Sequence, residues 1–242
     1  MILSTKKYVA FNLKELLIKG SLIIGVLAAL GPAILMSYYI LTVDSTSFYI
    51  KHVSNFYCML GMLAAVLHPL YFINRDYSSK AISLINNSKQ NRKNYVWGNI
   101  IIASLISLIY ATIGIVLLVV TKQLGVPGEL EATFLVGFFV NVFLLVLTFF
   151  LFGYILLLYG VRSGAVYVIL TALLLFIHNI LGNILGAVQN DFLTDLIENF
   201  PGYFYPVMVG SNPLSPLQYT IGLITLVIFT YLVLKKSEKI EM

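Results

Sequence analysis

The sequence has few charged residues: only 10% of its 242 residues are Asp, Glu, Lys or Arg, whereas 60% are apolar. Soluble domains carry about 25% charged and about 45–50% apolar residues. A water-soluble monomer of this size has no interior large enough to bury that much apolar surface. The composition therefore excludes an ordinary soluble enzyme and a disordered chain, and it indicates an integral membrane protein.

Cysteine and chemical motifs are equally scarce. Cys58 is the only cysteine, so no internal disulfide forms. The sequence contains no phosphate-binding loop, no His-Glu-x-x-His and no His/Cys cluster. Charges within the apolar runs, the usual mark of an ion-coupled carrier, are also missing. We therefore expect no catalytic residue, metal site or cofactor in this chain, and energy for any active transport comes from another chain.

What the sequence does have is long apolar runs. A helix needs about 20 mostly apolar residues to cross a hydrocarbon core of about 30 Å. The runs are continuous and do not alternate with period two, which favours helices over barrel strands. We predict an all-α membrane protein in one domain over residues 1–242, with six spans: about 21–43, 53–73, 97–121, 132–159, 164–188 and 217–234.

The basic residues are distributed unevenly between the two sides of these spans. With the amino terminus in the cytoplasm, every Lys and Arg except Lys51 and Lys122 falls on the cytoplasmic side. We therefore predict that both termini are cytoplasmic, and that the net charge of +5 is a topology signal and not a sign of nucleic-acid binding. The acidic residues expected outside are Asp44, Glu129, Glu131, Asp191, Asp195 and Glu198.

Residues 1–20 precede the first span and are predicted to form an amphipathic helix in the membrane interface. Within residues 7–19, four apolar side chains share one helical face, while Lys14 and Glu15 lie on another. The alternative is a basic flank that only orients the chain. The apolar face consists of Val9, Leu13, Leu16 and Leu17.

Residues 74–96, between spans two and three, form the only sizeable cytoplasmic loop. Asp76 and Ser78 are good helix-start residues, and Asn86-Asn87-Ser88 ends the predicted short helix before a basic cluster. Since a simple return needs only a few residues, we expect this amphipathic helix to dock on a partner. The alternative is a charged loop bound to anionic lipid headgroups. The apolar patch of the helix consists of Ala81, Ile82, Leu84 and Ile85.

Residues 188–217 form the largest outside segment, predicted to be a helical hairpin that lies on the membrane or re-enters it. Phe192, Leu196 and Phe200 recur on one helical face, and acidic residues lie on another. Pro201-Gly202 ends that helix. An ordinary amphipathic loop packed over the outer helix ends fits this pattern as well as a gating hairpin does.

Few polar residues lie within the spans. Four-residue spacing places His178, Gly182 and Gly186 on one face of the fifth span. Small and amide side chains serve helix packing or a dimer contact, and lining of a translocation path is the alternative. A metal or proton site is the third interpretation. The full set comprises Asn141 in the fourth span and His178, Asn179, Gly182, Asn183 and Gly186 in the fifth.

This arrangement resembles the ABC-2 type permeases of ATP-binding-cassette exporters. The resemblance covers most of the chain: a basic amphipathic amino-terminal helix, six spans, a cytoplasmic coupling loop and a long outer hairpin. Its most specific part is residues 74–99. The family commonly has an acidic residue, a Gly-Thr-like pair, an apolar patch, a Pro-Ser-Arg-like turn and a Lys entering span three. Here Asp76, Ser78-Ser79, Ile82 to Ile85 and Arg92 occupy similar places; the turn has no Pro, and Asn99 stands near the usual Lys.

The resemblance implies a half-transporter in the bacterial cytoplasmic membrane. A second permease subunit, identical or different, would pair with this chain among the membrane lipids, and a separate cytoplasmic ATPase would carry ATP and Mg. The size and composition are similar to those of Gram-positive exporters of cytolytic or antimicrobial peptides, among them the staphylococcal phenol-soluble modulins. The alternative is a non-transporting immunity or sensor protein that binds antimicrobial peptides. The implied ATPase-coupling residues are Asp76, Tyr77, Ser78, Ser79, Ala81, Ile82, Leu84, Ile85 and Arg92.

Overall fold

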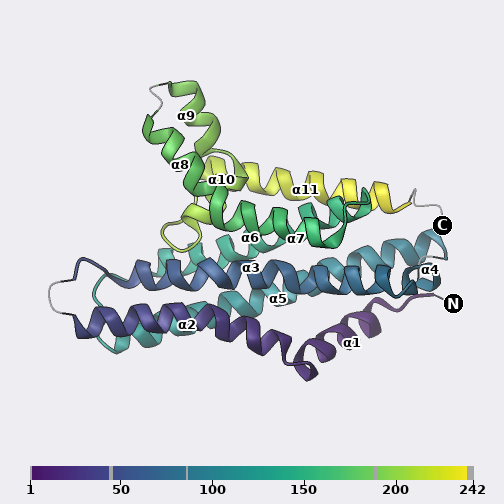
Figure 1. Cartoon of the computed structure of the whole chain (residues 1–242), viewed down its shortest axis with the longest axis horizontal. Coiled ribbons are helices and arrows are strands. Elements are labelled where there is room, and N and C mark those ends of the chain that lie inside the picture. Colours follow the sequence, from purple (N-terminus) through teal and green to yellow (C-terminus); the bar gives the residue numbers. More distant parts are fainter. Residues whose placement is uncertain (1, 44–45, 86, 188–189, 239–242) are drawn as a thin grey trace.

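The computed structural model shows a bundle of helices and describes residues 2–43, 46–85, 87–187 and 190–238 (Figure 1). Six helical segments in this part of the chain are long and apolar enough to cross a membrane. This confirms the prediction of an all-helical fold with six helices of membrane-spanning length and apolarity. Asp44, Lys239 and Val188, the last residue of the predicted fifth span, lie outside the described residues.

The helices follow the predicted order, but α3 and α5 extend beyond the predicted spans 53–73 and 97–121 into polar residues. They are α1 (Thr5–Ile18), α2 (Ser21–Thr42), α3 (Ile50–Ser78), α4 (Ala81–Ile85), α5 (Lys89–Gln123), α6 (Ala132–Leu158), α7 (Ser163–Ala172), the π-helical turn η1 (Leu173–Ile177), α8 (His178–Ala187), α9 (Asp191–Glu198), α10 (Pro201–Met208) and α11 (Pro216–Glu238). Hydropathy marks only the apolar part of a helix, whereas the backbone hydrogen bonds of α3 and α5 continue through polar residues. The fifth span is divided into α7, η1 and α8.

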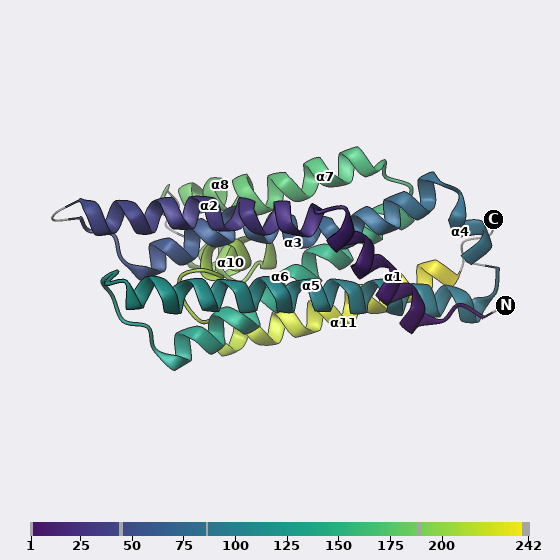
Figure 2. The same ribbon diagram turned by 90° about the horizontal axis from the view of Figure 1, so that it is seen from below.

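Both termini, α1 and α4 lie at one end of the bundle, named the terminal end (Figures 1 and 2). The α2–α3 and α5–α6 connections and α8–α10 lie toward the opposite end, named the hairpin end. Among the described residues, every Lys and Arg except Lys51 and Lys122 belongs to α1, to the α1–α2, α3–α4 or α6–α7 connection, or to the ends of α3, α5 and α11 that point toward the terminal end. The uneven charge of the sequence is thus an asymmetry between the two ends of the molecule.

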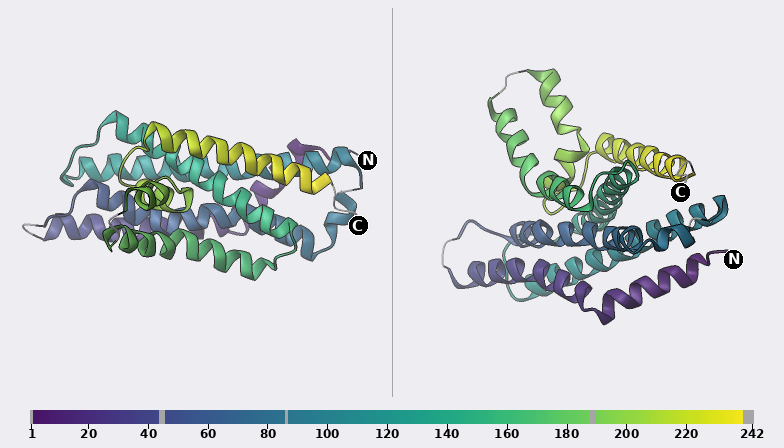
Figure 3. Two further views of the ribbon diagram at one scale, coloured as in Figure 1. Left: turned by 90° about the horizontal axis from the view of Figure 1, so that it is seen from above. Right: turned by 45° about the vertical axis from the view of Figure 1, so that its right-hand side comes forward.

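The core of the bundle lies around α6, which packs against α3, α5, α7 and α11. Of the most apolar stretch of α6, 72% is buried, compared with 11% for the α7–α8 span and 11% for α11. These outer helices are apolar yet exposed, as Figure 3 shows for α11 and α8 on the surface of the bundle. Their exposed faces are suited to lipid or to a second membrane subunit.

Three core helices meet closely at Gly114 of α5. A Cβ added at Gly114 would lie 2.7 Å from the Phe138 ring of α6 and 2.8 Å from the Tyr57 ring of α3. Both rings are buried, and the Tyr57 hydroxyl donates to the Tyr110 carbonyl at 2.6 Å. Helices approach this closely only where a side chain is missing.

The predicted bounds of the loop 74–96 were wrong at both ends, because helices extend into it from both sides. α3 continues through Asp76 to Ser78, so these residues end a span and do not begin the short helix. Lys80, with a left-handed φ of 58°, turns the chain into α4. Arg92 of the expected basic loop lies in α5, whose N-cap is Ser88. The side chains of Leu84 and Ile85 lie outside the described part of the structure.

The outer segment is a pair of short helices that joins α8 to α11. α9 ends at Glu198, just before Pro201-Gly202, and Pro201 is also the first residue of α10, where its fixed φ and missing N–H are tolerated. Phe204 and Tyr205 of α10 are fully buried and attach this segment to the bundle. α9 projects from the bundle on the side opposite α1 (Figure 3, right).

Candidate functional sites

Asp76 lies at the centre of a buried polar cluster at the terminal end. Its Oδ2 accepts hydrogen bonds from the hydroxyls of Tyr8 (2.8 Å) and Tyr95 (3.1 Å). Its Oδ1 accepts from Arg75 Nη2 (2.6 Å) and Nε (3.0 Å). The Asp76 side chain is only 4% exposed, so these four bonds replace the hydration of its charge.

Arg75 extends this cluster to the amino-terminal helix α1. Its guanidinium pairs with Glu15 and donates from Nη2 to Asn12 Oδ1 at 2.9 Å. Burial alone raises the pKa of Glu15, but the hydrogen bond from Lys19 and the charge of Arg75 hold it below its usual value. Charged hydrogen bonds of this kind are roughly twice as strong as neutral ones. Glu15, expected on the polar outer face of α1, therefore points toward α3 and binds it.

Tyr8 completes the link between α1 and α5. Its hydroxyl lies 3.2 Å from Asn99 Oδ1, and Asn99 Nδ2 donates to the Tyr95 carbonyl at 2.9 Å. Burial and the Asp76 carboxylate raise the pKa of Tyr8, which keeps its hydroxyl in the protonated form that donates. The Asp76 cluster thus joins α1, α3 and α5.

The outer surface of α1 combines exposed apolar side chains with exposed lysines. Phe11, Leu17 and Ile18 are exposed, with Lys14 among them, whereas Leu16 is buried against the bundle. Leu17 was predicted on the same face as Leu16 and is instead exposed, because the inner face is centred on the polar residues of the cluster. This surface is suited to a membrane interface, where a Lys stem lies along apolar groups.

The first turns of α5 hold residues near both ends of the chain. The Leu3 N–H donates to Asn91 Oδ1 at 2.7 Å. At the end of α11, Glu238 pairs with Lys89 at 3.2 Å and Lys93 at 3.3 Å. The basic cluster predicted in a loop is therefore partly neutralised within the chain.

The predicted coupling residues are divided between this interior, the exposed turn that leads from α3 into α4, and the partly buried start of α4. Ser78 and Ser79 are exposed, whereas Ile82 packs against the core. Asp76 lies two positions before the end of α3 and is buried, so it holds helices together and does not reach the surface. Tyr77, Ala81 and Arg92 are half-buried.

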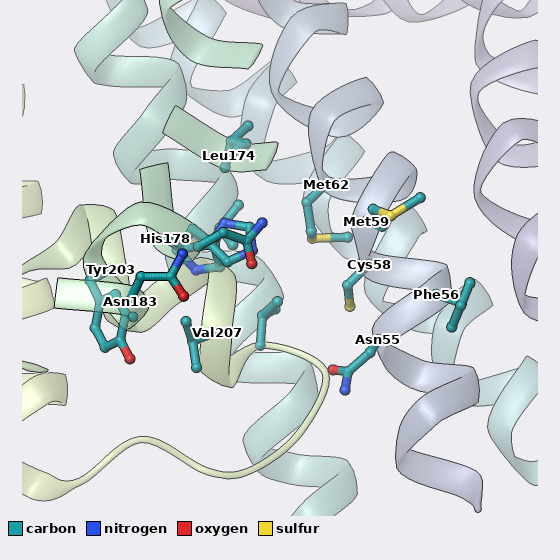
Figure 4. Close-up of a pocket in the computed structure, with 15 residues that line it drawn as sticks. Asn55, Phe56, Cys58, Met59, Met62, Leu174, His178, Asn183, Tyr203 and Val207 are labelled. Atoms are coloured by element: carbon teal, nitrogen blue, oxygen red, sulfur yellow. The ribbon is translucent and has the colours of Figure 1, made fainter. Parts of the chain in front are cut away.

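A cavity of about 500 Å³ lies between α3, α8 and α10 toward the hairpin end (Figure 4). None of the described residues that line it is charged. The lining combines amide, imidazole and hydroxyl groups with apolar and methionine side chains. It includes Asn55, Phe56, Cys58, Met59 and Met62 of α3, Leu145 of α6, Leu174 of η1, His178, Asn179, Gly182 and Asn183 of α8, and Tyr203, Pro206, Val207 and Val209.

The polar residues predicted in the fifth span separate into two groups. His178, Asn179, Gly182 and Asn183 line the cavity, whereas Gly186 is exposed and has no atom within 4 Å of an added Cβ. The π-helical turn η1 comes directly before His178, and such turns are frequent at functional sites. His178 Nδ1 is buried without a hydrogen-bond partner in the described structure.

Asn141 has a packing position away from the cavity. It is fully buried in α6, its Nδ2 donates to the Asn212 carbonyl at 3.1 Å, and its Oδ1 accepts from the Tyr219 hydroxyl at 3.1 Å. These bonds join α6 to α11 and to the connection before α11.

The predicted apolar face of the outer hairpin lies on α9 and is exposed. Phe192 is 74% exposed and Leu196 is 59% exposed, and Phe200 just beyond the helix is 45% exposed. The acidic residues of α9 form no ion pair within the described structure. α9 therefore presents an apolar face and a negative edge at the hairpin end.

Comparison with known proteins adds no family to this geometry. No protein-family model matches the chain, and a search of the curated proteins finds no match. Within the described residues, no group of three His, Cys, Asp or Glu is placed to hold a metal ion. The Asp76 cluster and the cavity are therefore the two candidate functional sites of the described structure.

Proposed function

We propose that this chain is the membrane-spanning subunit of an ATP-driven exporter of the ABC-2 type, with both termini in the cytoplasm. A second permease subunit would complete the translocation path, and a separate cytoplasmic ATPase would bind at α4. The observation that carries this proposal is the position of α4. It lies at the basic end of the bundle, directly after the Asp76 cluster that joins α1, α3 and α5.

The Asp76 cluster supports transmission of force from α4 into the bundle. α4 follows α3 after two residues, so a displacement of α4 acts first on the end of α3. The charged bonds of Arg75 and the hydroxyl bonds of Tyr8 and Tyr95 then require α1 and α5 to move with α3. A partner that binds α4 would therefore move three helices together.

The exposed outer helices support pairing with a second subunit. The α7–α8 span and α11 bury only 11% of their apolar stretches within the chain. The cavity lining contains amide, imidazole and aromatic groups and no charged residue among those described. Such a lining fits amphipathic or apolar cargo, such as cytolytic or antimicrobial peptides.

A peptide-binding immunity or sensor protein is the second candidate function. The observation that favours it is α9, whose exposed Phe192 and Leu196 accompany acidic side chains that form no ion pair within the described structure. Such a surface is complementary to a cationic amphipathic peptide. This function needs no ATPase, so the experiments below distinguish the two.

The orientation is tested by labelling one added cysteine at each end of the bundle. Ser83 of α4 and Ser47 of the α2–α3 connection are both exposed serines, and Cys58→Ala removes the single native thiol. A membrane-impermeant maleimide is expected to label Ser47→Cys in intact cells and Ser83→Cys only after permeabilisation, because the basic end faces the cytoplasm. The reverse pattern would refute the orientation.

The ATPase partner is tested by photocrosslinking from the same two positions in membranes of the source cells. A thiol-linked photocrosslinker on Ser83→Cys is expected to capture a protein that contains a phosphate-binding loop and hydrolyses ATP. Ser47→Cys, the matched control, is expected to capture none. ATPase activity in the purified complex, and its fall by at least about fivefold when Ser83→Cys carries a bulky label, would support coupling through α4. Equal capture from both positions, or capture of no nucleotide-binding protein, would contradict the exporter proposal.

A further inference from the structure

We infer that the cavity between α3, α8 and α10 binds the backbone of an uncharged, non-helical segment of an apolar peptide. That this peptide is the exported cargo rests on the proposed export function. Binding itself requires only this chain, so it is measurable without an ATPase. The cavity, about 500 Å³, has the size of sites that hold small molecules or short peptide segments.

The absence of charge in the cavity lining selects against ionic groups. Within the described structure, no Lys, Arg, Asp or Glu lines the cavity. A buried phosphate, carboxylate or ammonium group without a partner is strongly destabilised. A phospholipid headgroup would therefore lose hydration without gaining an ion pair, whereas a neutral ligand would not.

The polar groups in the lining match the needs of a peptide backbone. Within the described structure, the side chains of Asn183 and Tyr203 form no hydrogen bond. The Nδ1 atom of His178 also has no hydrogen-bond partner there. Asn179 uses its Nδ2 on the Leu175 carbonyl at 3.3 Å, and its Oδ1 has no described partner. Side-chain amides both donate and accept, as do the N–H and C=O groups of each peptide residue.

The apolar part of the lining is suited to side chains of varied shape. Met59 and Met62 of α3 line the same cavity as Phe56 and Leu174. Methionine is flexible and polarizable, so it adapts to ligands that differ in outline. A helix already satisfies its own backbone groups, so the unpaired polar lining fits an extended end or turn of a peptide better than its helical part.

The test uses two glycines of α8 as a matched pair. A Cβ at Gly182 meets nothing closer than the Tyr203 hydroxyl at 3.9 Å, and a Cβ at Gly186 meets nothing within 4 Å, so neither backbone position is closed to a side chain. Only Gly182 lines the cavity. The probe is an N-acetylated, C-amidated Leu-Ala-Gly-Leu-Ala-Gly peptide, titrated against the full chain in nanodiscs. Gly182→Leu is expected to raise the Kd at least about tenfold, with Gly186→Leu within about twofold of the unmodified chain. Equal effects of the two variants, or none from Gly182→Leu, would overturn the location.

Two further ligands test the recognised chemistry. The same peptide with N-methylated amides keeps the side chains but loses its N–H donors, and it is expected to bind at least about tenfold more weakly. Short-chain phosphatidylcholine is expected not to compete with the unmethylated peptide. Equal binding of the N-methylated peptide would overturn backbone recognition, and competition by the lipid would assign the cavity to lipid. If Ser83→Cys captures no ATPase but the peptide binds as expected, only the exporter proposal is refuted. If Ser83→Cys captures an ATPase but the peptide does not bind, only the peptide-binding inference is refuted.

Discussion

Replacing Asp76 by alanine is expected to lower the free energy of unfolding by about 3 kcal/mol. Loss of one partner from a buried ion pair costs about 3–5 kcal/mol, and partial exposure of Arg75 places this site at the low end. The substitution also removes the acceptor for Tyr8 and Tyr95. The fall is measured by reversible unfolding in mixed micelles, and proteolysis of the residue 4–19 segment is expected to accelerate with it because α1 loses its attachment.

Two variants make this result specific. Asp76→Asn keeps an oxygen that accepts a tyrosine hydroxyl but loses the charge, so about half the destabilisation is expected. Asp195→Ala removes a carboxylate of α9 that forms no ion pair within the described structure, and a change of no more than about 0.5 kcal/mol is expected. An unfolding free energy for Asp76→Ala equal to that of the unmodified chain would show that the cluster does not hold the helices together.

Gly114→Leu is expected to prevent stable packing of α3, α5 and α6. The first added carbon already lies within 2.8 Å of two buried rings, Phe138 and Tyr57, and three more carbons follow it. Overpacking of a core costs about 1–3 kcal/mol and occasionally more; here neither ring has free space, so a loss of at least about 3 kcal/mol is expected. The measurement is the yield of monodisperse protein and its melting temperature in detergent.

Gly164→Leu is the matched control for this second substitution. Gly164 also lies in a predicted span, but a Cβ there meets no atom within 4 Å. Its yield and melting temperature are expected to stay close to those of the unmodified chain. A Gly114→Leu protein that melts like Gly164→Leu would show that the three helices do not meet at Gly114.

The spans were predictable because each depends on a local run of apolar residues. Their ends were not, since α3 extends past Ile73 to Ser78 through polar side chains that helix hydrogen bonds still accommodate. The Asp76 cluster was also hidden. It brings together residues from 8 to 99 along the chain, and no pattern near Asp76 identifies Tyr8 or Glu15 as its partners.

The cavity was partly predictable from the sequence. Four-residue spacing selected His178 and Gly182, which do line it, but it also selected Gly186, which does not. Asn55 and Tyr203 were missed because they belong to other helices, and only tertiary packing brings them to α8. The π-helical turn has no sequence marker, since its five residues are ordinary apolar ones.

That turn has a consequence for the angular phase of the fifth span. In an α-helix, residues four apart advance by about 40°, so a stripe with this spacing drifts by about 160° over four steps. Val166, Leu170 and Leu174 begin such a stripe against the bundle, and His178 and Gly182 continue it into the cavity. A π-helical turn holds more residues than an α-helical turn and so cancels part of the drift. One wide turn thus allows a single stripe to serve first as a packing surface and then as a binding surface.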